Sequence, residues 1–185
     1  VLGGERGRKP VKSVFTFFTF AGIMKKNGGI DMADPRQLYY NKRGEILVKN
    51  LKSRHFDAYY CESKEDALAQ AMELIPKGAS VAWGGALSAD QIGLTEAIRS
   101  GNYHVIDRSA GKTPEEQKEI VKSWLFSDVF LTGANALSLD GQMVSIDGTG
   151  NRVAAICYGP DTVLVIAGMN KVEDTLDASI NRART

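Results

Sequence analysis

The fold is decided by residues 80–107, SVAWGGALSADQIGLTEAIRSGNYHVID. The apolar runs near its two ends, SVAW and YHVID, are typical of buried strands. Between them, Ser88 followed three residues later by Gln91 predicts the start of a helix that reaches about Arg99, and Gly101 predicts its stop. A strand, a helix and another strand in this order predict a βαβ unit with parallel strands.

The same alternation continues on both sides of this segment. Upstream, the aromatic run at 56–61 predicts a strand, and the capping box that begins at Ser63 predicts a helix. Downstream, Thr-Pro-Glu-Glu at 113–116 predicts a helix start, and the apolar run at 128–133 predicts a strand. The chain therefore alternates βαβαβαβ between 56 and 132, which predicts an α/β fold with a mostly parallel sheet between two layers of helices.

The rest of the chain predicts elements that flank or complete this sheet. They are a helix at 34–53, a β-hairpin insertion turning at Asp140-Gly141, a strand at 152–159, a buried strand at 162–168 and a closing helix at 170–184. The first of these helices presents Leu38, Leu47, Val48 and Leu51 on its apolar face, and we expect Gly44 to strain it.

The predicted domain organisation is a leader with little structure at 1–33 and a single domain at 34–185. Basic residues precede an apolar run at 14–24, as they do in a secretion signal, but no small-residue cleavage site follows it. The run is also too short to span a bilayer. We therefore expect a cytoplasmic protein without a membrane segment, and a secretion signal is the alternative interpretation.

Charge and cysteine content argue against several functional classes. Basic and acidic residues nearly balance, 23 against 22, which argues against nucleic-acid binding through bulk electrostatics. Cys61 and Cys157 lie far apart and form no Cys-x-x-Cys pair. We therefore expect no zinc site and no iron–sulfur cluster on this chain, and two buried, reduced thiols.

Candidate site residues follow from the rule that ligands bind beyond the carboxyl ends of parallel strands. Backbone N–H groups after the strand at 80–83 could hold an anion at the next helix, and the chain after 128–133 and 162–168 reaches the same edge. The candidate ligand-binding residues are Gly84, Gly85, Ser88, Thr132, Asn135, Asp147, Asn151, Arg152 and Lys171. Asp147 and Asp140 are the candidates for catalysis, and no spacing of metal ligands is present.

Each candidate also has a purely structural interpretation. The glycine pair is ordinary for a loop between strand and helix, and Ser88 can serve as a helix cap. Asp140 is explained by the hairpin turn alone. Arg108, which follows another strand, is interpreted as a surface arginine. The cluster Asp147, Asn151 and Arg152 is harder to explain by turn chemistry only, because a turn does not require a following arginine.

Several stretches together resemble the LUD domain, the family of lactate utilisation proteins. They are GGALS at 84–88, TGANAL at 132–137, the DG turn at 140–141, IDGTGNRVAA at 146–155, YGP at 158–160 and VIAGMNK at 165–171. The resemblance covers about residues 35–184. It implies the fold of the sugar-phosphate isomerase and CoA-transferase type. It also implies a role in L-lactate oxidation with iron–sulfur oxidoreductase partners, which would hold the clusters that this chain lacks.

The functions left open are of three kinds. The favoured one is a subunit of that lactate oxidation system that binds a small anionic metabolite. An autonomous isomerase or acyl/CoA transferase is the second, although Asn135 stands where the more distantly similar methylthioribose phosphate isomerase has an acid–base aspartate. The third is a non-catalytic scaffold that forms a homodimer through the hairpin.

Overall fold

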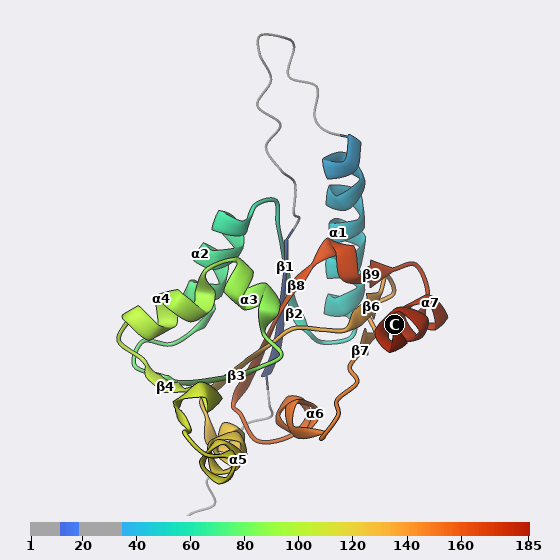
Figure 1. Cartoon of the computed structure of the whole chain (residues 1–185). Helices are drawn as coiled ribbons and strands as arrows, with labels where there is room; N and C mark the ends of the chain where they lie inside the picture. Colours follow the sequence, from blue (N-terminus) through green and yellow to red (C-terminus); the bar gives the residue numbers. More distant parts are fainter. Residues whose placement is uncertain (1–11, 19–34) are drawn as a thin grey trace, which may run out of the picture.

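The structure, a computed structural model, describes residues 12–18 and 35–185. Its centre is a six-stranded sheet in the order β2-β1-β8-β5-β3-β4, and all neighbouring strands in it run parallel (Figure 1). The strands are β1 (Lys12–Phe18), β2 (Asp57–Cys61), β3 (Ser80–Gly84), β4 (His104–Ile106), β5 (Val129–Thr132) and β8 (Thr162–Gly168). The order of β5, β3 and β4 confirms the parallel pairing predicted for residues 80–107.

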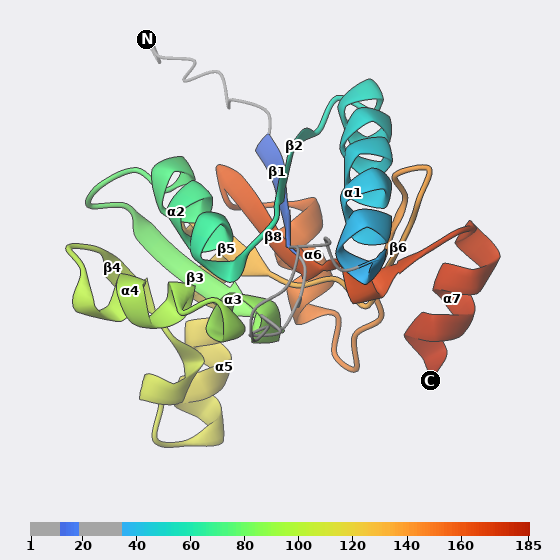
Figure 2. The same cartoon turned by 90° about the horizontal axis from the view of Figure 1, so that it is seen from above.

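Helices cover both faces of this sheet, which confirms the predicted three-layer α/β fold (Figures 1 and 2). On one face α2, α3 and α4 pack against the strands, and on the other face α1, α6 and the turn after α5 do so. The helices are α1 (Pro35–Ser53), α2 (Lys64–Leu74), α3 (Leu87–Gln91), α4 (Leu94–Ser100), α5 (Pro114–Ser123), α6 (Asn151–Cys157) and α7 (Leu176–Arg184). Short 3₁₀ turns are η1 (Arg108–Ala110), η2 (Trp124–Phe126) and η3 (Met169–Lys171).

A smaller sheet of three strands in the order β7-β6-β9 lies beside the main one. Its strands are β6 (Ala136–Ser138), β7 (Met143–Val144) and β9 (Val172–Glu173). The pair β6 and β7 is antiparallel and is the predicted hairpin, whose turn uses Gly141 at a φ of 90°. The inserted hairpin is therefore paired with the segment that follows β8 instead of standing alone.

Strand β1 corrects the prediction of a leader with little structure. Lys12–Phe18 pairs with β2 on one side and with β8 on the other, and Val14 and Thr16 are fully buried. A strand covered on both faces has a nearly continuous apolar sequence, and a signal segment has the same appearance. Residues 1–11 and 19–33 of the predicted leader lie outside the described residues.

Helix α6 corrects the strand predicted at 152–159. A short apolar run does not distinguish a buried strand from a helix, so the neighbouring residues decide. Gly150 adopts a left-handed φ of 74° just before the helix, and the carboxylate of Asp147 accepts a hydrogen bond from the backbone N–H of Val153 at 2.8 Å. This side-chain cap satisfies a helix N–H group that would otherwise have no partner.

Two other helix predictions hold only in part. The helix predicted from Ser88 to Arg99 is divided into α3 and α4 by Gly93, which has a φ of 80°, and Ser88 lies buried inside α3 instead of capping it. The closing helix begins only at Leu176, because residues 169–173 first form η3 and β9, and Thr175 then caps the helix.

Other helix signals are confirmed. Thr113 and Glu116 form the full capping box at the start of α5, and Ser63 caps α2. In α1, Gly44 has a packing role: a Cβ at this position would stand 2.4 Å from the ring of Tyr60. Glycine therefore lets α1 lie directly on β2, with Leu47 and Leu51 buried beneath it.

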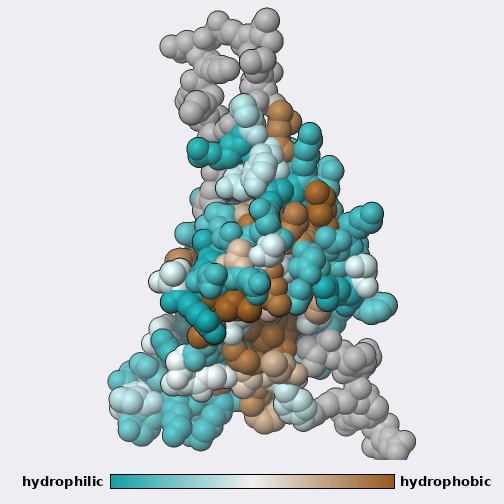
Figure 3. Space-filling view, turned by 90° about the vertical axis from the view of Figure 1, so that its right-hand side faces the viewer, coloured by the Kyte–Doolittle hydropathy of each residue, from teal (hydrophilic) through white to brown (hydrophobic). Residues whose placement is uncertain are grey.

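The face that carries α1 and α7 has an apolar area near its centre (Figure 3). A groove of about 520 Å³ also lies between the end of α1, the β6–β7 hairpin and α6. Its apolar lining includes Phe56, Met143 and Ile156. In the part of the chain that the structure describes, every helix is too short or too polar to cross a membrane.

Candidate functional site

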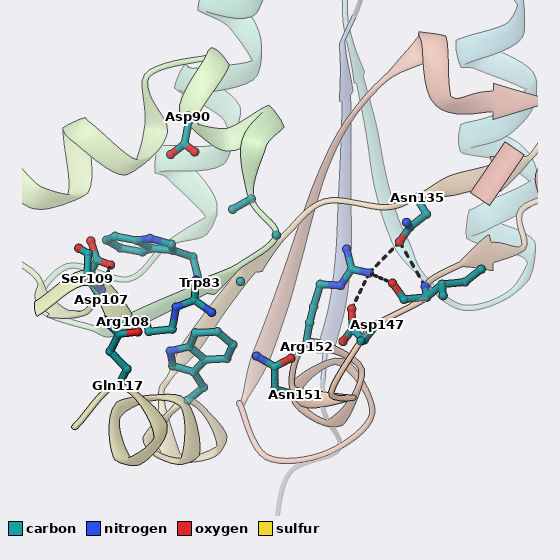
Figure 4. A pocket seen from close by; sticks show the side chains of 16 residues that line it. Trp83, Asp90, Asp107, Arg108, Ser109, Gln117, Asn135, Asp147, Asn151 and Arg152 are labelled. Atoms are coloured by element: carbon teal, nitrogen blue, oxygen red, sulfur yellow. Dashed lines mark hydrogen bonds and ion pairs between the residues drawn. The ribbon is translucent and has the colours of Figure 1, made fainter. Parts of the chain in front are cut away.

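A pocket of about 660 Å³ opens at the carboxyl end of β3 (Figure 4). Strand β4 pairs with β3 only along Ser80–Ala82, so the chain that follows Ile106 turns away and leaves the end of β3 uncovered. One wall comes from η1 and α5, and the other from the loop that precedes α6. The lining residues are Trp83, Gly84, Gly85, Ala86, Asp90, Asp107, Arg108, Ser109, Gln117, Trp124, Asn135, Ile146, Asp147, Gly148, Asn151 and Arg152.

Arg152 is the most firmly held side chain of the pocket. Its Nη2 atom donates to Asn135 Oδ1 at 2.7 Å and to the carbonyl oxygen of Ile146 at 2.9 Å. The same atom pairs with Asp147 Oδ1 at 2.7 Å, and only 13% of the Arg152 side chain and 9% of the Asp147 side chain are exposed. Charge-assisted bonds between such buried groups are strong and fix the guanidinium group in one orientation.

Asp147 joins the start of α6 to this arginine. One carboxylate oxygen pairs with Arg152, and the other accepts from Val153, so both oxygens are engaged. Asn135, which follows β5, accepts from Arg152 and also from the backbone N–H of Ile146 at 3.2 Å. These contacts hold the loop between β7 and α6 against the end of β5.

The glycine pair after β3 is required by packing. Gly85 has a φ of 60°, and a Cβ there would stand 2.9 Å from Nη1 of Arg152. A Cβ on Gly84 would stand 2.8 Å from the ring of Trp124. Helix α3 beyond this loop has only five residues, so it supplies little of the dipole predicted to bind an anion. The positively charged groups that line the pocket are the side chains of Arg108 and Arg152 instead.

The opposite wall carries a second arginine. Asp107 accepts from Arg99 at 2.8 Å and from the backbone N–H of Ser109 at 2.9 Å. Burial pushes the pKa of Asp107 upward, but these hydrogen bonds outweigh it and hold the pKa below its ordinary value. The adjacent Arg108 is exposed, makes no ion pair within the described residues, and extends toward the middle of the pocket (Figure 4).

The structure gathers six of the predicted ligand-binding residues in this pocket and places three elsewhere. Those in the pocket are Gly84, Gly85, Asn135, Asp147, Asn151 and Arg152. Thr132 is fully buried and donates to the carbonyl oxygen of Gly84, which is a structural role. Asp140 lies at the tip of the hairpin, where Ser138, Gln142 and Arg54 contact its carboxylate, and it does not line the pocket.

Ser88 and Lys171 line a separate depression of about 360 Å³. The Nζ atom of Lys171 donates to Ser88 Oγ at 3.3 Å. Burial lowers the pKa of Lys171, and repulsion by Arg182 and Arg152 lowers it further. No carboxylate pairs with this ammonium group in the described part of the chain.

Sequence reasoning missed several lining residues. Asp107 and Arg108 lie at the end of the strand predicted at 103–107, and the rule about strand ends does include them, but the interpretation of Arg108 as a surface arginine left both out of the candidates. Trp83 belongs to a strand that was predicted, but nothing in its sequence context indicates which side of the strand end it faces. Gln117 and Trp124 come from α5 and the turn after it, and no local pattern signals their contribution. Within residues 12–18 and 35–185, no group of His, Cys, Asp and Glu could hold a metal ion.

Comparison with known proteins identifies the family. Neither the curated proteins nor the solved structures provided a match. The family model of the LUD domain matches residues 44–185, which is well over half of the chain and includes every residue that lines the pocket. The sequence motifs that resemble this domain supply the Gly84–Gly85 loop and the Asp147–Arg152 wall of the pocket. The chain therefore belongs to the LUD domain family.

Proposed function

We propose that this protein is a subunit of an iron–sulfur-dependent system for L-lactate oxidation and that it binds a small anionic metabolite in the pocket at the end of β3. Membership of the LUD domain family supports the link to lactate utilisation. The observation that carries the binding role is the presence of two guanidinium groups on opposite walls, Arg108 and Arg152, beside the Gly84–Gly85 loop (Figure 4).

The partners of the charged residues in the pocket support an anion as ligand. Each of its three aspartates already has a polar partner: Asp147 has Arg152, Asp107 has Arg99, and Asp90 accepts from Thr95 at 2.6 Å. Arg108 makes no ion pair within the described residues, whereas Arg152 is paired with Asp147. The guanidinium group of Arg108 is therefore available to pair with a carboxylate or phosphate of a ligand.

The chemistry of the same residues supports binding over proton transfer. Asn135 is an amide and does not exchange protons at neutral pH. Both carboxylate oxygens of Asp147 accept bonds from groups of the chain itself, which favours a structural role for this residue over proton transfer to a ligand. We therefore assign the electron transfer of lactate oxidation to iron–sulfur partner proteins and the binding of the metabolite to this chain.

Ligand-induced thermal stabilisation tests the binding role. L-Lactate or pyruvate at about 100 times Kd contributes about 2.7 kcal/mol to the stability of the protein that binds it. We expect the shift in Tm to disappear in Arg108→Ala, because this exposed side chain makes no ion pair that folding requires. Arg184→Ala, which removes an equally exposed arginine from the end of α7, should keep the shift. Equal shifts in both variants, or none in the unmodified protein, would overturn the proposal.

A reconstitution assay tests the role as a subunit. Extract from cells that lack the gene of this chain should lose L-lactate-dependent reduction of an electron-accepting dye. Adding the purified unmodified protein should restore the activity, and adding Arg108→Ala should not. Full dye reduction without the chain would contradict its assignment to the system.

A further inference from the structure

The ligand of the pocket can be specified further, on the assumption of the proposed function that an anion binds there. We propose that this ligand is an organic anion that also carries a planar ring, and that the ring lies against Trp83 while the anionic group lies between Arg108 and Arg152. A nucleoside phosphate and an aromatic 2-hydroxy acid share this chemistry.

The size of the pocket is the first argument. Its volume of about 660 Å³ falls within the range of about 300–1,000 Å³ that is typical of pockets for ligands much larger than a three-carbon acid. L-Lactate bound at the arginines would leave most of this space unfilled. A ligand that uses the whole pocket therefore needs a second, larger part beyond its anionic group.

The tryptophans are the second argument. The chain contains two tryptophans, and both line this pocket. Trp83 is half-buried, and the guanidinium group of Arg99 lies 5.0 Å from the centroid of its ring. Arg99 is in turn held by Asp107 at 2.8 Å. The indole is therefore a braced, flat, apolar surface in a pocket whose other walls are largely polar, and aromatic rings stack on such surfaces.

Unsatisfied donors are the third argument. Trp124 is 97% buried against Phe130 and the backbone of Gly84, and its Nε1 atom has no hydrogen-bond partner among the described residues. The Nε atom of Arg152 is buried and unpaired in the same way. A buried donor without a partner costs free energy, so a ligand whose acceptor atoms reach either of these donors would gain a hydrogen bond that the chain itself does not supply. Nucleobases and oxyanions both supply such atoms.

The indole surface and the two guanidinium groups lie close enough together to contact one ligand. Trp83 and Arg108 lie on the same side of the pocket, and Asn151 and Arg152 lie on the other side (Figure 4). A ring stacked on Trp83 thus has a guanidinium group next to it and a second one across the pocket. The ring and the anionic group can therefore belong to one molecule of moderate size.

The test compares two pairs of probes that differ by a ring. Adenosine 5′-monophosphate is compared with ribose 5-phosphate, and 3-phenyllactate with L-lactate, by calorimetry on the full chain. We expect at least one ring-bearing probe to bind about tenfold or more tightly than its ringless counterpart, as stacking on an indole provides. Comparing the affinities of the two phosphate probes with those of the two carboxylate probes shows which anionic group the pocket prefers. Binding should also quench the fluorescence of the tryptophans.

Variants of Trp83 connect the effect to the proposed contact. Trp83→Leu should lower the affinity for the ring-bearing probes much more than the affinity for the ringless probes, whereas Trp83→Phe should keep most of the preference for the ring. If both ringless probes bind as tightly as their ring-bearing counterparts, or if neither ring-bearing probe binds, the ring subsite is refuted. Binding of ringless anions that depends on Arg108 would still support the proposed function, so the two failures are distinguishable.

Discussion

The buried pair between Asp147 and Arg152 provides the sharpest test of how the pocket is built. Replacing Asp147 with alanine removes two contacts at once: the ion pair to Arg152 at 2.7 Å and the cap on the N–H of Val153 at 2.8 Å. The first contact holds the guanidinium group of the pocket, and the second holds the start of α6. The variant should therefore weaken both the fold and the site.

The expected magnitude follows from these two contacts. Removing one partner of a buried ion pair costs about 3–5 kcal/mol, because the remaining charge stays buried. Here the lower end applies, since Arg152 keeps its bonds to Asn135 and to the carbonyl of Ile146. Loss of the cap adds about 1 kcal/mol. The free energy of unfolding should fall by about 4 kcal/mol, which for a chain of this size lowers Tm by roughly 8–16 °C.

Urea denaturation of a double-mutant cycle measures the pair itself. Asp147→Ala, Arg152→Met and the double variant should show a coupling of about 2 kcal/mol, with the double variant less destabilised than the sum of the two single variants. Asp161→Ala, at an exposed position, should change stability by less than about 0.5 kcal/mol. The assignment of the pair as the anchor of the site would be refuted if Asp147→Ala lost no more stability than Asp161→Ala does. It would also be refuted if the stability losses of the two single variants simply added up in the double variant.

Two other predictions concern the neighbouring residues. Gly85→Ala and Gly78→Ala both place alanine at a positive φ, of 60° and 76°, which costs about 1–2 kcal/mol. Only at Gly85 would the added methyl group also contact Arg152. Urea denaturation should therefore show a larger loss of unfolding free energy for Gly85→Ala than for Gly78→Ala, and equal losses would contradict this packing. Lys171→Met should raise the stability at pH 7, because burial lowers the pKa of the folded-state lysine and the unfolded chain therefore binds its proton more tightly. This gain in stability should vanish as the pH rises through 10.5, the ordinary pKa of lysine, because the side chain is then neutral in both states. If Lys171→Met is less stable than the unmodified protein at pH 7, the bond to Ser88 outweighs the cost of burying the charge.

Local patterns were sufficient where an element is specified by its own residues. The capping box at Thr113, the cap at Ser63, the proline at the first position of α1 and the turn at Gly141 identify elements that the structure contains. Local patterns were insufficient where contacts with residues outside the run determine its structure. The run at 152–159 became a helix because Asp147 caps it, and Lys12–Phe18 became a central strand because β2 and β8 flank it.

The sequence by itself determined the alternation of strands and helices, the parallel sheet and the family, because these depend on periodicity and on motifs that are continuous in the chain. Only the tertiary structure decided the composition of the pocket. The tertiary structure places Arg108 and Trp83 on the wall opposite Arg152, and it places Lys171 in a separate depression. The physical reason is that a side chain's position relative to a pocket depends on strand order and on where each strand ends. Here β4 ends before β3 does, and this difference opens the site.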